Sequence, residues 1–191
     1  WCIVGLWLSA LAPAQNKYQL HSFTKRQLTS EFYCEGASYG DFNRDGVQDI
    51  VAGPYWYQGP DFAKRHEYYP PKPFDKNRYS DNFFAFVYDF DADGWNDILI
   101  IGFPGRDATW FRNPQGVAGH WKRHQVFDVV DNESPTFVDL TGDGKPELVC
   151  QIGDRMGYAV VDWADPAKKW VFHGISDPKA KIGGKFTHGL G

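Results

Sequence analysis

The sequence lacks a surplus of basic residues, and it contains only one methionine and three cysteines. Its 191 residues carry a formal net charge of −4, so no positive field favours nucleic acid as a partner. Beyond the first fifteen residues, no apolar run is long enough to cross a bilayer. We therefore expect no membrane span in the mature protein.

Catalytic and metal motifs of several familiar kinds are missing too. His120 and His124 have His-x-x-x-His spacing, but they fall in a segment with strand character rather than on a helix, and no Cys/His spacing accompanies them, so zinc is unsupported. The chain has no glycine loop of the type that cradles phosphate. These absences favour a binding protein over an enzyme but leave both open.

Aromatic and turn-forming residues are abundant instead. The chain holds 8 Trp, 10 Tyr and 15 Phe, together with 20 Gly and 12 Pro. With 42% hydrophobic residues it can bury a core, and it shows little Leu-rich helical patterning. This composition predicts a β-rich fold.

The first residues have the character of an export signal. Residues 1–14 read WCIVGLWLSALAPA, an apolar stretch that ends in small residues, as in a secretory signal peptide with its cleavage site. The initiator Met and the basic start are missing, so we expect a signal peptide truncated at its N-terminus. The mature protein, residues 15–191, would be secreted to the extracellular space or the periplasm. Its cysteines would be Cys34 and Cys150, whose pairing stays open and which we interpret as buried thiols.

Three short acidic segments repeat along the chain. They read DFNRDGVQD (41–49), DFDADGWND (89–97) and DLTGDGKPE (139–147), and they start 48 and 50 residues apart. They hold ten of the 24 acidic residues, which leaves 14 acids against 20 bases elsewhere. Carboxylates at this density repel one another unless a cation lies among them, so the pattern favours metal binding.

Short apolar runs on both sides of each acidic segment predict strands. Residues 83–88 and 98–101, for example, are rich in Phe and Ile and are too short for helices. Less exact sequence repeats predict two further strands in each unit. A third strand is predicted at 56–60, 110–114 and 163–166, and a fourth at 23–26 and 121–124. Four strands at a period of roughly 40–50 residues are typical of a β-propeller blade. We interpret the Pro-rich residues 57–82 as a surface loop.

Oxygen-bearing residues recur at positions 1, 3, 5 and 9 of each acidic loop, and position 7 offers a backbone carbonyl. Hard oxygen ligands in a flexible loop favour Ca²⁺ over Mg²⁺, so we expect about three calcium ions. An EF-hand is excluded, because position 12 is Ala, Ile or Cys and the flanking segments are strands. The predicted ligands are Asp41, Asn43, Asp45, Val47 and Asp49 in the first loop, Asp89, Asp91, Asp93, Trp95 and Asp97 in the second, and Asp139, Thr141, Asp143, Lys145 and Glu147 in the third.

The three loops are not equivalent. The third has Thr141 at position 3 and Glu147 at position 9, and fewer charges should weaken its affinity for calcium. The predicted ligands are nearly used up within each loop. We therefore expect structural ions that pin hairpins together, rather than catalytic ones.

These loops and the strands around them resemble the FG-GAP/VCBS repeats of integrin α-subunit propellers and of many secreted bacterial proteins. The resemblance covers about residues 20–191 and is most specific in the acidic loops. It implies an all-β fold, a β-propeller of seven or eight four-stranded blades, with each calcium between the first and second strands of a blade. Because only three such loops are present, we expect three to four blades here and an incomplete C-terminus.

Polar residues recur where the innermost strand of each repeat should start, at the end opposite the calcium loop. They are Glu35, Asn82, Glu133 and His188. Around the central funnel of a propeller these side chains could form a ligand site. The alternative is that Glu35 and Glu133 cap strand ends in solvent.

Two classes of function follow. The first is a secreted calcium-binding module for binding or adhesion, with an unknown protein or carbohydrate ligand. The second is a polysaccharide-active enzyme, because some propellers that resemble this one, including rhamnogalacturonan lyases, act on acidic sugars with calcium-rich scaffolds. That function needs an open calcium and a base such as His188. We favour the first class, because no catalytic set is recognisable in the sequence.

Overall fold

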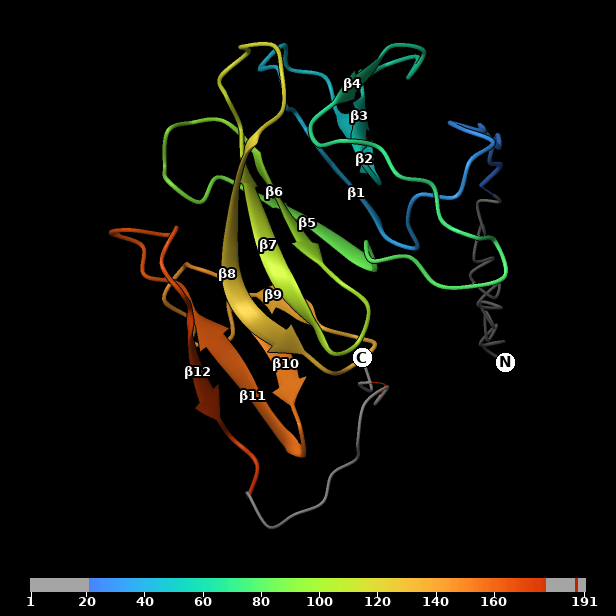
Figure 1. Cartoon of the computed structure of the whole chain (residues 1–191). Coiled ribbons are helices and arrows are strands. Elements are labelled where there is room, and N and C mark those ends of the chain that lie inside the picture. Colours follow the sequence, from blue (N-terminus) through green and yellow to red (C-terminus); the bar gives the residue numbers. More distant parts are fainter. Residues whose placement is uncertain (1–20, 178–187, 189–191) are drawn as a thin grey trace, which may run out of the picture.

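A computed structural model describes residues 21–177 and residue 188, so the predicted signal peptide lies outside the described residues. The regular elements of the described part are twelve β-strands in three four-stranded antiparallel sheets (Figure 1). Within each sheet, neighbouring strands follow one another along the chain, so each sheet is an up-and-down meander. The described residues contain no helix of the length and apolarity that crossing a membrane requires.

The sheets follow the three sequence repeats. The first holds β1 (Ala37–Gly40), β2 (Asp49–Ala52), β3 (Tyr55–Tyr57) and β4 (Arg65–Glu67), the second β5 (Phe84–Tyr88), β6 (Asp97–Ile101), β7 (Arg106–Arg112) and β8 (Lys122–Val130), and the third β9 (Thr136–Val138), β10 (Glu147–Ile152), β11 (Arg155–Val160) and β12 (Val171–Gly174). Each acidic loop joins the first two strands of its sheet. The all-β class and the four-stranded repeat are thus confirmed. Three sheets are fewer than a closed ring needs, so the propeller and its blade number stay predictions.

The fourth strands differ in part from expectation. β8 begins at Lys122, where the echo at 121–124 predicted it, but residues 23–26 form no strand. The first sheet instead takes β4 from the segment interpreted as a surface loop. Tyr68, directly after β4, is fully buried and donates a 2.8 Å hydrogen bond from its hydroxyl to Gly53 O. A three-residue strand of sequence Arg-His-Glu carries no apolar pattern, which is why the sequence did not reveal it.

The second sheet has a core on each of its faces. Ile98 and Leu99 are neighbours on β6, so their side chains point to opposite faces. Ile98 packs in a cluster with Val51 of the first sheet, and Leu99 in another with Leu148 of the third. Every residue of β6 is buried, which explains its unbroken apolar run after Asp97. The sheets therefore pack through their faces, as neighbouring blades do.

The acidic loops take part in this packing through the residue at position 2. Phe42 contacts Trp121, just before the fourth strand of the second sheet, with ring centroids 6.0 Å apart. Phe90 makes the equivalent contact with Trp170 before β12, at 5.7 Å. Both phenylalanines are at most 2% exposed, whereas Leu140 at the same position of the third loop is 48% exposed. Burying a Phe side chain stabilises a fold by about 1.5–3 kcal/mol. Each of the first two loops thus anchors the next sheet.

Candidate functional site

The three acidic loops share one set of hydrogen bonds, although their sequences differ. In each, the carboxylate at position 1 accepts the backbone N–H groups of positions 5 and 6, and the carboxylate at position 5 accepts that of position 7. These distances lie between 2.8 and 3.2 Å. The glycine at position 6 has a φ of 83°, 85° and 86° in the three loops, a conformation that glycine adopts without strain. The bonds hold the position-7 residues Val47, Trp95 and Lys145 in the same local fold.

Position 9 anchors each loop to its sheet. In the second loop, fully buried Asp97 accepts hydrogen bonds from the backbone N–H groups of Phe90 at 3.1 Å and Asn113 at 2.7 Å. Asp49 is also fully buried, and it accepts the equivalent pair of N–H groups in the first repeat at 2.9 Å each. A carboxylate has about four acceptor sites, so both side chains keep lone pairs for a cation.

The second loop brings three carboxylates together. One oxygen each from Asp89, Asp91 and Asp97 lies within 4.8 Å of the others. Both oxygens of Asp91 are buried and accept no well-directed hydrogen bond. Arg112 supplies positive charge, with Nε 2.5 Å from Asp91 Oδ2 and Nη2 3.5 Å from Asp93 Oδ2. A single guanidinium does not balance four carboxylates, so the loop retains excess negative charge.

Burial raises the pKa of two carboxyl groups in the second loop. It raises the pKa of Asp97 to about 7, against the opposing effect of the hydrogen bonds from Asn113 and Phe90. The pKa of Asp91 is raised first by burial and then by the charge of Asp93. A divalent cation among these groups would lower their pKa values again. An all-oxygen donor set of this kind fits calcium.

The first and third loops are more open. In the first, Asn43 occupies position 3, and its amide donates a 2.8 Å hydrogen bond to Asp45 Oδ2. In the third, residues 139–145 are all exposed. Glu147 there accepts the backbone N–H groups of positions 2 and 3, at 2.9 and 3.2 Å. Within residues 21–177 and 188, three metal-ligating carboxylates converge in the second loop alone.

Two asparagines connect the first acidic loop to the second, and the sequence patterns did not single them out. Asn113 Nδ2 donates to the carbonyl oxygens of Phe42 at 3.0 Å and Asn96 at 2.9 Å. Asn96 Nδ2 donates to Asp41 O at 3.0 Å. The repeated sequence Trp-Phe-Arg-Asn-Pro at 110–114 indicated a strand that ends in a turn at this place. Which groups the Asn113 amide reaches depends on the neighbouring sheet, which no local pattern reveals.

A second unpredicted repeat pairs an aromatic ring on the third strand of each sheet with a histidine opposite it on the fourth. The rings stack with centroids 3.8, 4.8 and 5.4 Å apart in the pairs Trp56–His66, Trp110–His124 and Tyr158–His173. Burial lowers the pKa of His66 and His124, which favours their neutral form. These histidines thus act as packing rings between strands.

The four polar residues expected at the strand starts form two pairs. The Glu35 N–H donates to Asn82 O at 3.1 Å, and the Glu35 carboxylate accepts the Ser80 N–H at 2.9 Å. Glu133 Oε2 lies 2.8 Å from His188 Nε2. Glu35 therefore caps a backbone N–H of the segment before β5. A funnel site shared by all four residues stays a prediction.

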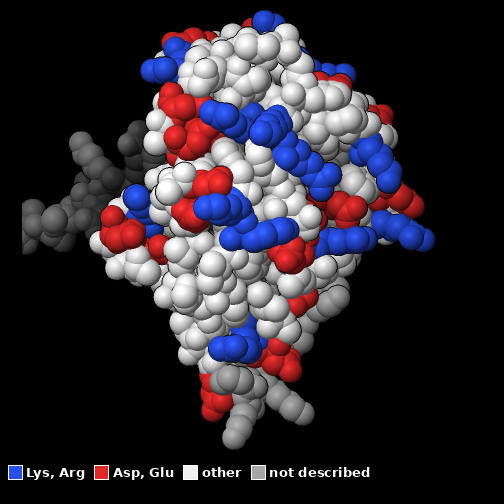
Figure 2. All heavy atoms as spheres, turned by 60° about the vertical axis from the view of Figure 1, so that its left-hand side comes forward, with Lys and Arg blue, Asp and Glu red and all other residues white. Residues whose placement is uncertain are grey.

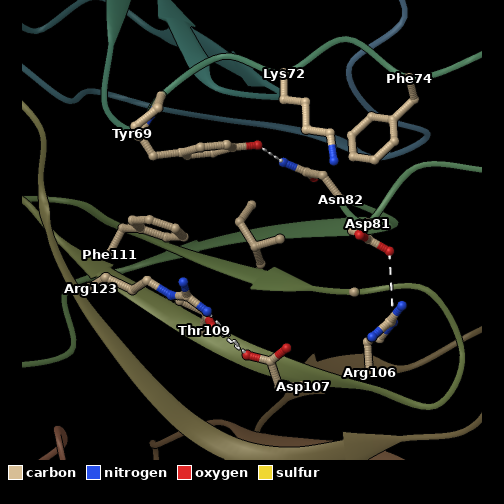
Figure 3. A pocket seen from close by; sticks show the side chains of 13 residues that line it. Tyr69, Lys72, Phe74, Asp81, Asn82, Arg106, Asp107, Thr109, Phe111 and Arg123 are labelled. Carbon is tan, nitrogen blue, oxygen red and sulfur yellow. Dashed lines mark hydrogen bonds and ion pairs between the residues drawn. The ribbon is translucent and has the colours of Figure 1, made fainter.

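A cavity of about 410 Å³ lies beside Asn82 (Figure 3). Its walls are the segment after β4 and strands β6, β7 and β8 of the second sheet. Gly102 and Arg106 border the turn between β6 and β7, so this cavity reaches the end of the sheet opposite the acidic loop. The charged and aromatic side chains in its wall are Tyr69, Lys72, Phe74, Asp81, Arg106, Asp107, Phe111 and Arg123.

The outer surface carries charges of both signs. Figure 2 shows rows of Lys and Arg side chains on one face, with Asp and Glu side chains between them. An unbroken basic patch is the usual electrostatic footprint of nucleic-acid binding. The face in this view has no such patch.

Comparison with known families identifies the repeat. Residues 89–150 match the FG-GAP-like repeat. The chain thus contains an FG-GAP-like repeat. The matched FG-GAP segment runs from the first Asp of the second acidic loop, through the third loop, to Cys150 in β10. The first acidic loop has the same hydrogen bonds as the two loops inside the match. No curated protein and no solved structure matches the chain.

Proposed function

We propose that this FG-GAP repeat protein is a secreted, calcium-binding β-propeller module that binds or adheres to another molecule. The acidic loops hold about three structural Ca²⁺ ions, and the second loop holds its ion most tightly. The sheets described above are neighbouring blades of the propeller. The ligand of the module is a protein or a carbohydrate.

The second acidic loop carries the calcium part of this proposal. Asp91 has two buried oxygens without a well-directed hydrogen bond, and Asp97 has a pKa raised to about 7. Both features are unfavourable for ionised carboxylates, and the Arg112 guanidinium beside Asp91 offsets only part of this cost. Asp89 and Asp93 would complete the set of acidic ligands. A bound Ca²⁺ would supply the missing positive charge and cancel the repulsion among the four side chains.

Calcium would stabilise the module rather than act on a substrate. A ligand that binds the folded chain alone adds about 2.7 kcal/mol when its concentration is 100 times Kd. The loops also hold the neighbouring sheets, through Asn113 and through Phe42 and Phe90. Calcium binding in the loops would therefore strengthen the contacts between sheets as well.

Calorimetric titration of the metal-free chain with calcium, together with melting scans in calcium and in chelator, tests the proposal. We expect calcium to raise the melting temperature by about 5–10 °C for a gain of roughly 2.7 kcal/mol. Asp91→Asn should remove the tightest site, whereas Asp154→Asn, in the exposed turn between β10 and β11, should leave all sites intact. Identical melting curves in calcium and in chelator would contradict the proposal.

A further inference from the structure

The cavity beside Asn82 has the features of a second, calcium-independent binding site. Its wall combines the segment after β4, which follows the first sheet, with strands of the second sheet (Figure 3). Its volume of about 410 Å³ lies within the roughly 300–1,000 Å³ of small-molecule sites. None of the predicted calcium ligands lines it. Whatever binds here can therefore be separated experimentally from calcium.

The cavity has one positive charge without a partner. Arg106 lies 3.8 Å from Asp81, and Arg123 lies 3.8 Å from Asp107, so these four charges balance. Lys72 has neither a hydrogen bond nor an ion pair with any described residue, and its Nζ lies 5.9 Å from the centroid of the Phe74 ring. Figure 3 shows the Lys72 side chain extending from its loop into the cavity. Lys72 is thus available to a ligand that carries one negative charge.

The cavity also offers a buried acceptor and aromatic rings. Asn82 is 2% exposed, and its Nδ2 donates a 3.0 Å hydrogen bond to the Tyr69 hydroxyl. Its Oδ1 is buried and accepts no hydrogen bond. A buried acceptor in this state is unfavourable, so a small rearrangement of the Asn82 amide that lets a ligand hydroxyl donate to Oδ1 would be favourable. Tyr69 and Phe111 stack on each other at 5.2 Å and line the same cavity, where they provide apolar surface.

We propose that this cavity binds a sugar acid, a compact ring that carries hydroxyl groups and one carboxylate. The carboxylate pairs with Lys72, a hydroxyl donates to Asn82 Oδ1, and the apolar face of the ring packs on the aromatic wall. The single spare charge matches one carboxylate better than a phosphate group, which carries about −1.5 to −2 at neutral pH. The inference rests on the carbohydrate option of the proposed function and names its substrate class.

Titration of the full chain in calcium buffer with methyl β-glucuronoside tests this site. The comparison ligands are methyl β-glucoside, which lacks the charge, cyclohexanecarboxylate, which lacks the hydroxyls, and inorganic phosphate. We expect the glucuronoside to bind at least about tenfold more tightly than each of them, as for one charge-assisted hydrogen bond. Lys72→Met should weaken glucuronoside binding about tenfold. Lys76→Met, an exposed change on the same segment outside the cavity wall, should not affect it.

Each comparison can overturn one part of the inference. Equal binding of the glucoside would remove the role of charge, and equal binding of cyclohexanecarboxylate would remove the hydroxyl contact at Asn82. Phosphate binding as strong as that of the glucuronoside would leave a simple anion site. Asp91→Asn should lose the tightest calcium site but keep the sugar acid. A wild-type chain that titrates normally with calcium and does not bind the glucuronoside overturns this inference alone, and the converse result overturns only the calcium proposal.

Discussion

Asp97 has two roles in the second repeat. It accepts backbone hydrogen bonds that close the loop onto its sheet, and it belongs to the carboxylate cluster proposed to bind calcium. The same burial that makes its hydrogen bonds strong raises its pKa to about 7. Without a cation, the folded chain therefore keeps a proton on Asp97 that the unfolded chain releases above about pH 4.

Without calcium, Asp97 should make the folded chain less stable as pH rises. Its folded pKa of about 7 exceeds the unfolded value, so its contribution is present below about pH 4 and is lost as pH rises through 7. In chelator, the unfolding free energy of wild type should fall by about 2–3 kcal/mol more between about pH 5 and pH 8 than that of Asp97→Asn. Urea denaturation measures both. The lowered pKa values of His66 and His124 act in both proteins and cancel. Equal losses would exclude the raised pKa.

The two described cysteines are free thiols, as expected from the sequence. Cys150 is buried, and Cys34 is half-buried. Burial raises their pKa values to about 12 and about 11, so both thiols stay protonated at neutral pH. A protonated thiol is a poor nucleophile and a poor metal ligand.

At the scale of the loop, the backbone is repeated more faithfully than the side chains. All three acidic loops keep the bonds from position 1 and position 5, because these need only a carboxylate and a glycine at fixed spacing. The residue at position 3 and its exposure both differ between loops. Position 3 is half-buried Asp91 in the second loop and exposed Thr141 in the third. The residues that set the loop geometry are thus shared by all three loops, whereas the proposed metal ligand at position 3 is not.

Thr141→Asp should give the third loop an acidic residue at positions 1, 3, 5 and 9, as in the second loop. We expect its calcium affinity to rise several-fold, because charge count tunes affinity in such loops. In chelator the same change should lower the melting temperature, since the new carboxylate would face Glu147, to which Thr141 Oγ1 is hydrogen-bonded at 3.3 Å. Calorimetry and melting scans test the two effects. Thr24→Asp, exposed and outside every loop, should produce neither. A variant that is less stable in both conditions would show that the third loop does not bind calcium.

At the scale of the whole molecule, the sheets hold together through a contact that is repeated from one to the next. Phe42 and Phe90 each reach from an acidic loop to a Trp of the following sheet. On the third sheet Val138, Leu140 and Val171 are 43%, 48% and 61% exposed. No described residue covers them as Phe42 and Phe90 are covered.

Phe90→Ala and Leu140→Ala compare the two environments at the same loop position. Phe90→Ala should lower the unfolding free energy by about 3–5 kcal/mol, as for a large aromatic side chain removed from a core. Leu140→Ala should cost less than about 1 kcal/mol, because half of its surface is already in water. Urea denaturation in calcium measures both values. A loss at Leu140 as large as that at Phe90 would mean that this face is covered in solution, as a further blade would cover it.

The sequence by itself determined the features that depend on local spacing. The acidic loops, their glycine turns and the strands on both sides follow from residues at most about ten positions apart, and the structure reproduces them in each repeat. Only the tertiary structure determined the contacts between residues of different repeats. Asn113 bonds to Phe42, Asn82 bonds to Tyr69, and the cavity forms between a loop and a sheet that lie apart in the sequence. Such contacts depend on how the packed sheets are oriented, which no local pattern of residues encodes.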